Sequence, residues 1–288
     1  MLRVWRRCVE TNKLKKGIIN NRYGEKNLNI FTNCPLYTSL AKNDLYYDEF
    51  VKRGLVRTAK RGDYDKIIEE LYFRLLNFFS LEPSLQSKSE SISKDWDNRY
   101  VIGMQIRVGI GNSAFSDNCK FLFKSDIRTF VHYAEYYSNQ TKKEPLWFVS
   151  TDAPDVEFMF KTTYGKRVFT ISDLPMKHTK VLAYSYKDPG VQRAILDNYL
   201  LSKSDLLITT AWSSFGEMAL GRMSKGSTIL ITRGDPIMDP PPIVSFDRNK
   251  NCTMLDVFDN KLCMELMRVF VLCRWMSFGI GFLYYTHI

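Results

Sequence analysis

Three apolar runs in this sequence end in side chains that could bind a phosphorylated ligand. Arg107 ends the run "VIGMQIR", Asp152 follows "LWFVST", and Ser213 and Ser214 follow "LLITTAW". An arginine presents a planar fork of donors that fits phosphate oxygens. Backbone N–H groups at a helix start attract anions, and a carboxylate accepts hydrogen bonds from base N–H groups and ribose hydroxyls. Together these residue types suit a nucleotide.

Each of these features also has an ordinary structural explanation. An arginine after a strand is often a surface cation, and paired serines before a helix are often only a cap. A binding site is favoured because all three features follow strands of one predicted sheet.

The hydrophobic pattern after residue 98 alternates between strand and helix periods. Strands are predicted at 101–107, 146–150, 167–171, 205–209 and 227–232. Helices are predicted between them, from near Ser125, at 155–163, at 191–204 and after the turn "TAWSS". This alternation predicts parallel βαβ units and a doubly wound, Rossmann-like α/β sheet. Ligands bind that fold beyond the carboxyl ends of the strands, where Arg107, Asp152 and Ser213 are placed.

Three regions are predicted along the chain: a reduced N-terminal region at 1–98, a Rossmann-like ligand-binding domain at 99–250, and a hydrophobic helix or tail at 251–288. The first region contains an amphipathic helix that Asp63 or Asp65 can cap. The Ser- and charge-rich stretch 82–99 is predicted to be a linker or an exposed loop. Arg274 interrupts the apolar tail, which then falls short of the ~20 residues that span a bilayer. A buried terminal helix or an interfacial segment on a membrane both fit this tail.

The sequence lacks the motifs of several well-known sites. It contains no G-x-x-x-x-G-K-[ST] run, which excludes a P-loop NTPase, and Gly109-x-Gly111 lacks the third glycine of a dinucleotide fingerprint. Two D-x-D tripeptides begin at Asp63 and Asp95, one at a helix start and one in a polar stretch. Neither ends an apolar strand, so we interpret them as a cap and a loop. The six cysteines form no C-x-x-C pair, which argues against zinc-knuckle and thioredoxin-like sites.

The net charge of +10 favours an anionic partner. The lysines and arginines are dispersed and lack the aromatic interleaving of an RNA-binding sheet, so a nucleic acid ranks last among such partners. Two sequons, at Asn139 and Asn251, would be glycosylated only in a secretory lumen.

Two stretches of the chain resemble the GDP-fucose-dependent fucosyltransferases. "IGMQIRVG" is similar to their hydrophobic strand followed by (H/Q)-x-R, and "AILDNYLLSKSDLLITTAWSSFGEMALG" is similar to their later helix, strand and serine-rich turn. "TRGDPIMDPPP" and the form Gln105-Ile106-Arg107-Val108 resemble the plant-type xyloglucan α-1,2-fucosyltransferases. The upstream "LYFRLLNFFSLEPSLQ" also resembles this family, so the resemblance extends from residue 67 to residue 245.

The resemblance implies a GT-B-like fold and an inverting fucosyltransferase that needs no metal and no cofactor. It also implies a Golgi membrane location, GDP-fucose as the donor, and a glycan acceptor ending in galactose. Arg107 would be the catalytic residue and would neutralise the β-phosphate of the donor. The residues that the resemblance assigns to GDP-fucose binding are Gln105, Arg107, Gly109, Asp152, Asp197, Ser213, Ser214 and Phe215.

The chain departs from the family pattern in several respects, including the lack of the usual cysteine in the Pro-rich segment. Val108 stands where better-studied relatives have a second arginine, and the N-terminal region is short for an acceptor domain. The alternative is therefore a catalytically inactive remnant that binds a nucleotide sugar or a glycan. No motif names a catalytic base, which would lie in the N-terminal region or in the 109–120 loop, where Asp117 is the one carboxylate.

Overall fold

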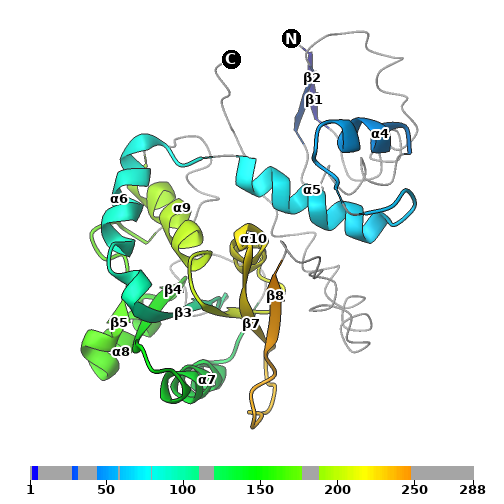
Figure 1. The fold of residues 1–288 in the computed structure, drawn as a ribbon. Helices are drawn as coiled ribbons and strands as arrows, with labels where there is room; N and C mark the ends of the chain where they lie inside the picture. The colour runs from blue at the N-terminus through cyan, green and yellow to red at the C-terminus, as the bar shows by residue number, and fades with distance from the viewer. Residues whose placement is uncertain are drawn as a thin grey trace. The chain divides into compact units, whose positions relative to one another are not determined.

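The structure is a computed structural model that describes residues 2–5, 28–31, 44–57, 59–78, 80–109, 120–176 and 188–247. The predicted tail at 251–288 and the candidate base Asp117 lie outside these residues. The chain divides into two compact units, and the division falls between Phe78 and Phe79 (Figure 1). In the described part, no helix is both long and apolar enough to cross a bilayer.

The first unit has two short parallel strands and two helices in its described residues. These elements are β1 (Leu2–Trp5), β2 (Leu28–Phe31), α4 (Asp44–Lys52) and α5 (Tyr64–Phe78). The predicted amphipathic helix is confirmed as α5, and Asp63 caps it by accepting from the backbone N–H of Lys66 at 3.4 Å. Ile67 and Leu71 of this helix are buried with Val56 and Ala59. The sequence analysis missed α4 and both strands.

The second unit begins with a helix where the sequence predicted a linker or loop. Helix α6 (Pro83–Ser93) has Glu82 as its N-cap, and a short 3₁₀ turn, η2 (Trp96–Asn98), follows it. The loop prediction is therefore wrong. The serines that suggested exposure are small enough to pack, because Ser89 is fully buried beside Leu85 on the same helix face. The helix also belongs to the second unit, although the sequence placed the domain boundary near residue 98.

A six-stranded sheet forms the centre of the second unit. In spatial order its strands are β5 (Val168–Phe169), β4 (Glu144–Thr151), β3 (Arg99–Ile106), β6 (Leu206–Thr210), β7 (Lys225–Ile231) and β8 (Val244–Asp247). The first five are parallel, and β8 pairs antiparallel with β7. The predicted Rossmann-like α/β sheet is confirmed, with β8 as an addition. The chain runs outward from β3 through β4 to β5 and then crosses to β6, so the strand order reverses between β3 and β6.

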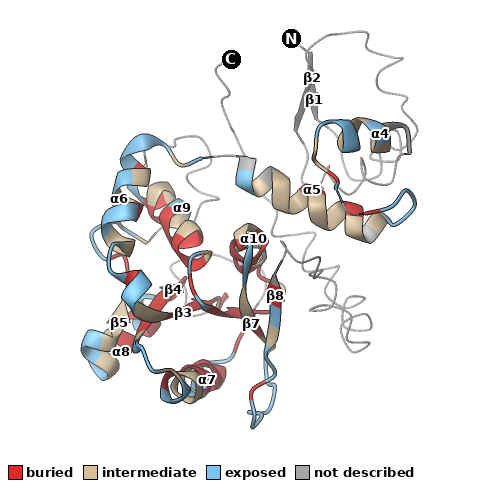
Figure 2. Ribbon diagram, in the orientation of Figure 1, coloured by how far each residue is buried: buried red, intermediate tan, exposed pale blue. Residues whose placement is uncertain are grey.

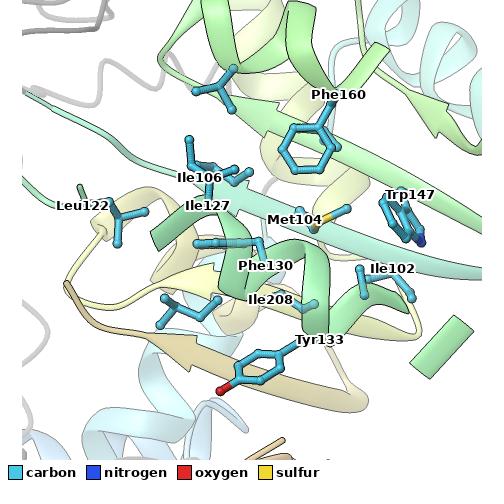
Figure 3. Packing of buried hydrophobic residues seen from close by; sticks show 14 of the residues in the cluster. Ile102, Met104, Ile106, Leu122, Ile127, Phe130, Tyr133, Trp147, Phe160 and Ile208 are labelled. Carbon is cyan, nitrogen blue, oxygen red and sulfur yellow. The ribbon is translucent and has the colours of Figure 1, made fainter. Parts of the chain in front are cut away.

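Helices cover both faces of this sheet (Figure 1). They are α7 (Ile127–Gln140), preceded by the turn η3 (Lys124–Asp126), α8 (Pro154–Tyr164), α9 (Pro189–Leu201) and α10 (Ser214–Arg222). Phe130 of α7 and Phe160 of α8 pack in one core with Ile102 and Met104 of β3 (Figure 3). The buried residues gather on the sheet and on the helix sides that face it (Figure 2), and removing this apolar surface from water stabilises the layered arrangement.

The alternation of side chains along β3 separates two faces. Ile102, Met104 and Ile106 belong to the core with α7 and α8. Gly103 lies on the opposite face, where an added Cβ would be 2.7 Å from the Ser204 Oγ that follows α9. A strand places alternate residues on opposite faces, so Gln105 and Arg107 continue on the side of α9 and α10.

Candidate functional site

Arg107 lies at the point where the strand order of the sheet reverses. It follows the last residue of β3, and its backbone N–H donates to Thr210 Oγ1 at the carboxyl end of β6 at 2.9 Å. The same hydroxyl donates to the carbonyl of Gln105 at 3.1 Å. Thr210 therefore joins the carboxyl ends of the two strands that flank this point. The Arg107 side chain is 22% exposed, so it is held by the fold and still reaches solvent.

Asp152 fixes the turn that follows Arg107. Its Oδ1 accepts from the backbone N–H of Val108 at 2.8 Å, and its Oδ2 accepts from the backbone N–H of Gly109 at 3.0 Å. Oδ2 also lies 3.4 Å from Arg107 Nε, and the carboxylate is only 2% exposed. Hydrogen bonds to a charged group are among the stronger ones in proteins. The predicted contact between Asp152 and the nucleoside stays a prediction. The hydrogen bonds by which Asp152 holds the turn after Arg107 are seen in the structure.

Gly109 adopts a backbone conformation that favours glycine, and Gln105 makes a buried hydrogen bond to the neighbouring strand. Gly109 has φ of 79°, a left-handed conformation that favours glycine. The Oε1 atom of Gln105 is buried and accepts from Thr209 Oγ1 at 2.7 Å. A Cβ on Gly216 of α10 would lie 1.9 Å from that hydroxyl. Glycine at this position therefore lets the start of α10 approach the sheet beside Gln105.

The first turn of α10 lies next to the same edge of the sheet. Ser213 is the buried N-cap residue, and its backbone carbonyl accepts from the backbone N–H of Glu217 at 2.9 Å. Ser214 and Phe215 are half-buried, and the carbonyl of Phe215 accepts from Asn198 Nδ2 at 2.7 Å. This helix start brings backbone N–H groups and the positive end of a helix dipole to the carboxyl end of β6.

Trp212 is a feature of this turn that the sequence analysis missed. Its φ is 64°, which is uncommon for a bulky side chain and costs conformational energy. It comes between the end of β6 and the N-cap Ser213. No sequence pattern signals such a conformation, because it depends on how β6 and α10 are held.

Asp197 lies in a second, enclosed polar cluster. Its Oδ2 accepts from Ser150 Oγ of β4 at 3.1 Å and lies 3.6 Å from Arg193 Nε. Arg193 in turn donates to Glu157 of α8 at 2.5 Å and to the carbonyl of Leu174 at 3.1 Å. Burial raises the pKa of Asp197 to about 7, although Arg193 and Ser150 act in the opposite direction.

The predicted site residues thus fall into three groups. Arg107, Gly109 and Asp152 are in direct contact, and Gln105 lies behind them on β3. Ser213, Ser214 and Phe215 follow the neighbouring strand β6, whereas Asp197 is bonded to β4. Among the residues that the structure describes, no cluster of histidine, cysteine or carboxylate side chains suits a metal ion.

Comparisons with known proteins give structural likeness only. No protein-family model matches the chain, and no curated protein does. Among solved structures, it is similar to the fucosyltransferase NodZ from Bradyrhizobium, with a TM-score of 0.38 and 14% identity over 67% of this chain and 54% of that one.

Two other solved structures are similar to a comparable degree. NodZ α-1,6-fucosyltransferase soaked with GDP-fucose gives a TM-score of 0.40 and 12% identity over 84% of this chain and 67% of that one. A variant of FUT1 from Arabidopsis thaliana in complex with GDP gives 0.40 and 14% over 67% and 47%. The chain thus spans between about half and two thirds of these proteins.

Proposed function

We propose that this protein transfers fucose from GDP-fucose to a hydroxyl of a glycan, with inversion at the anomeric carbon, and that the product is an α-1,2 linkage to galactose. The proposal rests on the two motifs that carry the family resemblance and on where the fold places them. The observation that carries it is the position of Arg107, a part-exposed cation at the reversal point of a Rossmann-like sheet. Ligands of doubly wound sheets bind in the crevice at this point.

The chemistry of the transfer explains why a cation is needed there. As the bond between the anomeric carbon and the diphosphate breaks, negative charge grows on the leaving GDP and positive charge grows on the sugar. A positive group fixed beside the leaving oxygens stabilises this state more than the ground state. Arg107 has that role, and the N-terminus of α10 adds N–H donors and a favourable dipole. The acceptor hydroxyl attacks from the opposite side of the sugar, which gives inversion.

The remaining donor contacts follow from the same arrangement. Ser213, Ser214 and Phe215 line the phosphate and the base at the start of α10. The proposed contact between Asp197 and the guanine rests on the resemblance alone, because Ser150 and Arg193 enclose its carboxylate. The base that takes the acceptor proton would come from the N-terminal region or from the 109–120 loop, where Asp117 is the one carboxylate. A Golgi membrane location and a galactose-ended acceptor complete the proposal.

The test combines binding and turnover. Calorimetric titration with GDP, GDP-fucose, UDP and CMP should give binding to the two guanine nucleotides only. Incubation with GDP-fucose and a panel of galactose-ended glycans should then release GDP over time. Tight GDP binding without release would favour an inactive nucleotide-sugar-binding protein, and indifference to GDP would remove the proposal.

A further inference from the structure

A turn that carries Arg233 follows the carboxyl end of β7 and contacts Lys120, which pairs with Gly109 after β3. The turn begins with Thr232, whose backbone N–H donates to Asp235 Oδ2 at 3.1 Å, and Gly234 has φ of 79°. Between them stands Arg233, which is exposed. The Asp235 hydrogen bond and the left-handed Gly234 thus stabilise the turn, and Arg233 within it is exposed to solvent.

Lys120 connects this turn to the candidate site. It pairs across a single β-bridge with Gly109, and the backbone N–H of the next residue, Phe121, donates to the carbonyl of Val108 at 3.0 Å. Arg233 Nη1 donates to the carbonyl of Lys120 at 2.9 Å. A chain of direct contacts therefore leads from the Arg107–Gly109 turn through Lys120 to Arg233.

The two cations share one aromatic ring. Lys120 Nζ lies 4.9 Å and the Arg233 guanidinium carbon 5.3 Å from the centre of the Phe123 ring. Cation–π attraction at these distances holds both side chains near the edge of the sheet. Two positive charges on one ring also repel each other, and an anion between them would relieve that repulsion.

These cations differ from several others in the second unit. Arg99, Lys124, Lys161 and Arg193 each have a carboxylate within ion-pair distance. In the part of the chain that the structure describes, no carboxylate lies within 4.0 Å of the charged nitrogens of Lys120 or Arg233. Arg107 itself lies beside Asp152, whose negative charge offsets its own. A diphosphate carries several negative charges, so the Arg107–Asp152 pair alone leaves them largely uncompensated.

We propose that Lys120 and Arg233 form a second anion subsite that binds the diphosphate of the nucleotide sugar together with Arg107. This inference rests on the proposed function and adds two residues that the motifs do not contain. Phe123 positions the two cations, and the Thr232–Asp235 turn holds Arg233 at the edge.

Calorimetric titration of the full chain with GDP and with guanosine tests the subsite. Lys120→Gln and Arg233→Gln should each weaken GDP binding by about tenfold, as expected for loss of one hydrogen bond from a charged donor. Guanosine lacks the phosphates, so its affinity should stay within about twofold in both variants, because only charge-dependent contacts are removed. Lys124→Gln is the matched control, because Lys124 is a nearby exposed lysine that pairs with Asp155.

The outcomes separate this inference from the function on which it rests. If wild type binds GDP and both variants bind it equally well, the subsite is wrong and the proposed function stands. Equal losses for GDP and guanosine would mean that the variants disturb the fold, which would also overturn the subsite. If wild type fails to bind GDP, the proposed function and the subsite both fail.

Discussion

Two Asp–Arg pairs lie in the second unit of this protein, and their surroundings differ. Asp152 and Arg107 meet at the carboxyl end of β3, where Asp152 is buried and Arg107 is 22% exposed. Asp197 and Arg193 meet where α9 packs over β4, and both side chains are only 7% exposed. Arg193 also pairs with Glu157, so the second pair is part of an enclosed network of charges. The first pair lies where the central strand β3 ends.

The difference shows how one pair of residue types can serve either binding or stability. A buried carboxylate that holds an exposed arginine keeps that cation in place while leaving it able to meet a ligand. A fully enclosed pair gives little access to any ligand and makes the fold depend on its charges, because losing one partner leaves the other uncompensated. We therefore expect mutations in the first pair to affect function and mutations in the second to affect stability.

The largest expected effect is on stability and comes from Arg193→Ala. Removing one partner of a buried ion pair costs about 3 to 5 kcal/mol, and Glu157 and Asp197 both lose this cation. Chemical denaturation at neutral pH measures the free energy of unfolding. Arg167→Ala is the control, since Arg167 pairs with Glu135 at a part-exposed position, where such pairs are worth about 1 kcal/mol or less. Equal costs for the two variants would contradict the comparison.

Arg107→Ala should affect transfer rather than stability. Without this cation the transition state loses at least about 3 kcal/mol of stabilisation, a fall of more than about a hundredfold in kcat/KM. The free energy of unfolding should change by less than about 1 kcal/mol, because the side chain is part-exposed. Release of GDP from GDP-fucose measures the first quantity, and Arg128→Ala on α7 is an exposed-arginine control. Near-normal turnover would remove Arg107 from the mechanism.

Asp152→Asn should separate positioning from binding. An asparagine amide would face one of the two backbone N–H groups that the carboxylate now accepts from, so the Arg107–Gly109 turn should loosen. We expect kcat to fall about tenfold while the Kd for GDP stays within about threefold, because the Asp152 charge that offsets Arg107 is also removed. A simple folding defect would instead lower the fraction of protein that binds GDP. That result would make Asp152 structural only.

Asp197 should make the stability of the protein depend on pH. The pKa of Asp197 rises from 3.8 to about 7 on folding, so the folded state holds this proton more tightly than the unfolded state. Stability should therefore fall as pH rises from about 4 to about 7, by at most about 1.4 kcal/mol per pH unit from this group.

Asp197→Asn should remove that slope. Chemical denaturation between pH 4 and pH 8 gives the free energy of unfolding of wild type and variant at each pH. Glu157 is present in both proteins, so its contribution cancels in the difference. Asp155→Asn makes the same charge change at an exposed position. If the wild-type and Asp197→Asn curves run parallel, Asp197 does not titrate differently in the folded state.

Much of the second unit could be predicted from the sequence. The alternation of strand and helix periods predicted the five strands β3–β7 and the four helices between them. Elements that pack against other layers bury residues at a regular spacing, and this spacing is visible in the sequence. Helix α6 was missed because its buried face uses Ser89 beside Leu85 and shows little hydrophobic period. The antiparallel strand β8 follows a proline-rich stretch and has only four residues.

The sequence by itself determined which side chains follow the strands, and so that Arg107, Asp152 and Ser213 meet one edge of a sheet. It also determined that Arg193 and Asp197 share a helix face, since they are four residues apart. Only the tertiary structure decided that the Asp152 carboxylate accepts hydrogen bonds from Gly109 and Val108, which are 43 and 44 positions away in the sequence. The same holds for the hydrogen bond from Arg107 to Thr210, which spans 103 positions. Such contacts depend on how the sheet orders its strands and on which side chains its helices bury, and no local pattern in the chain specifies either.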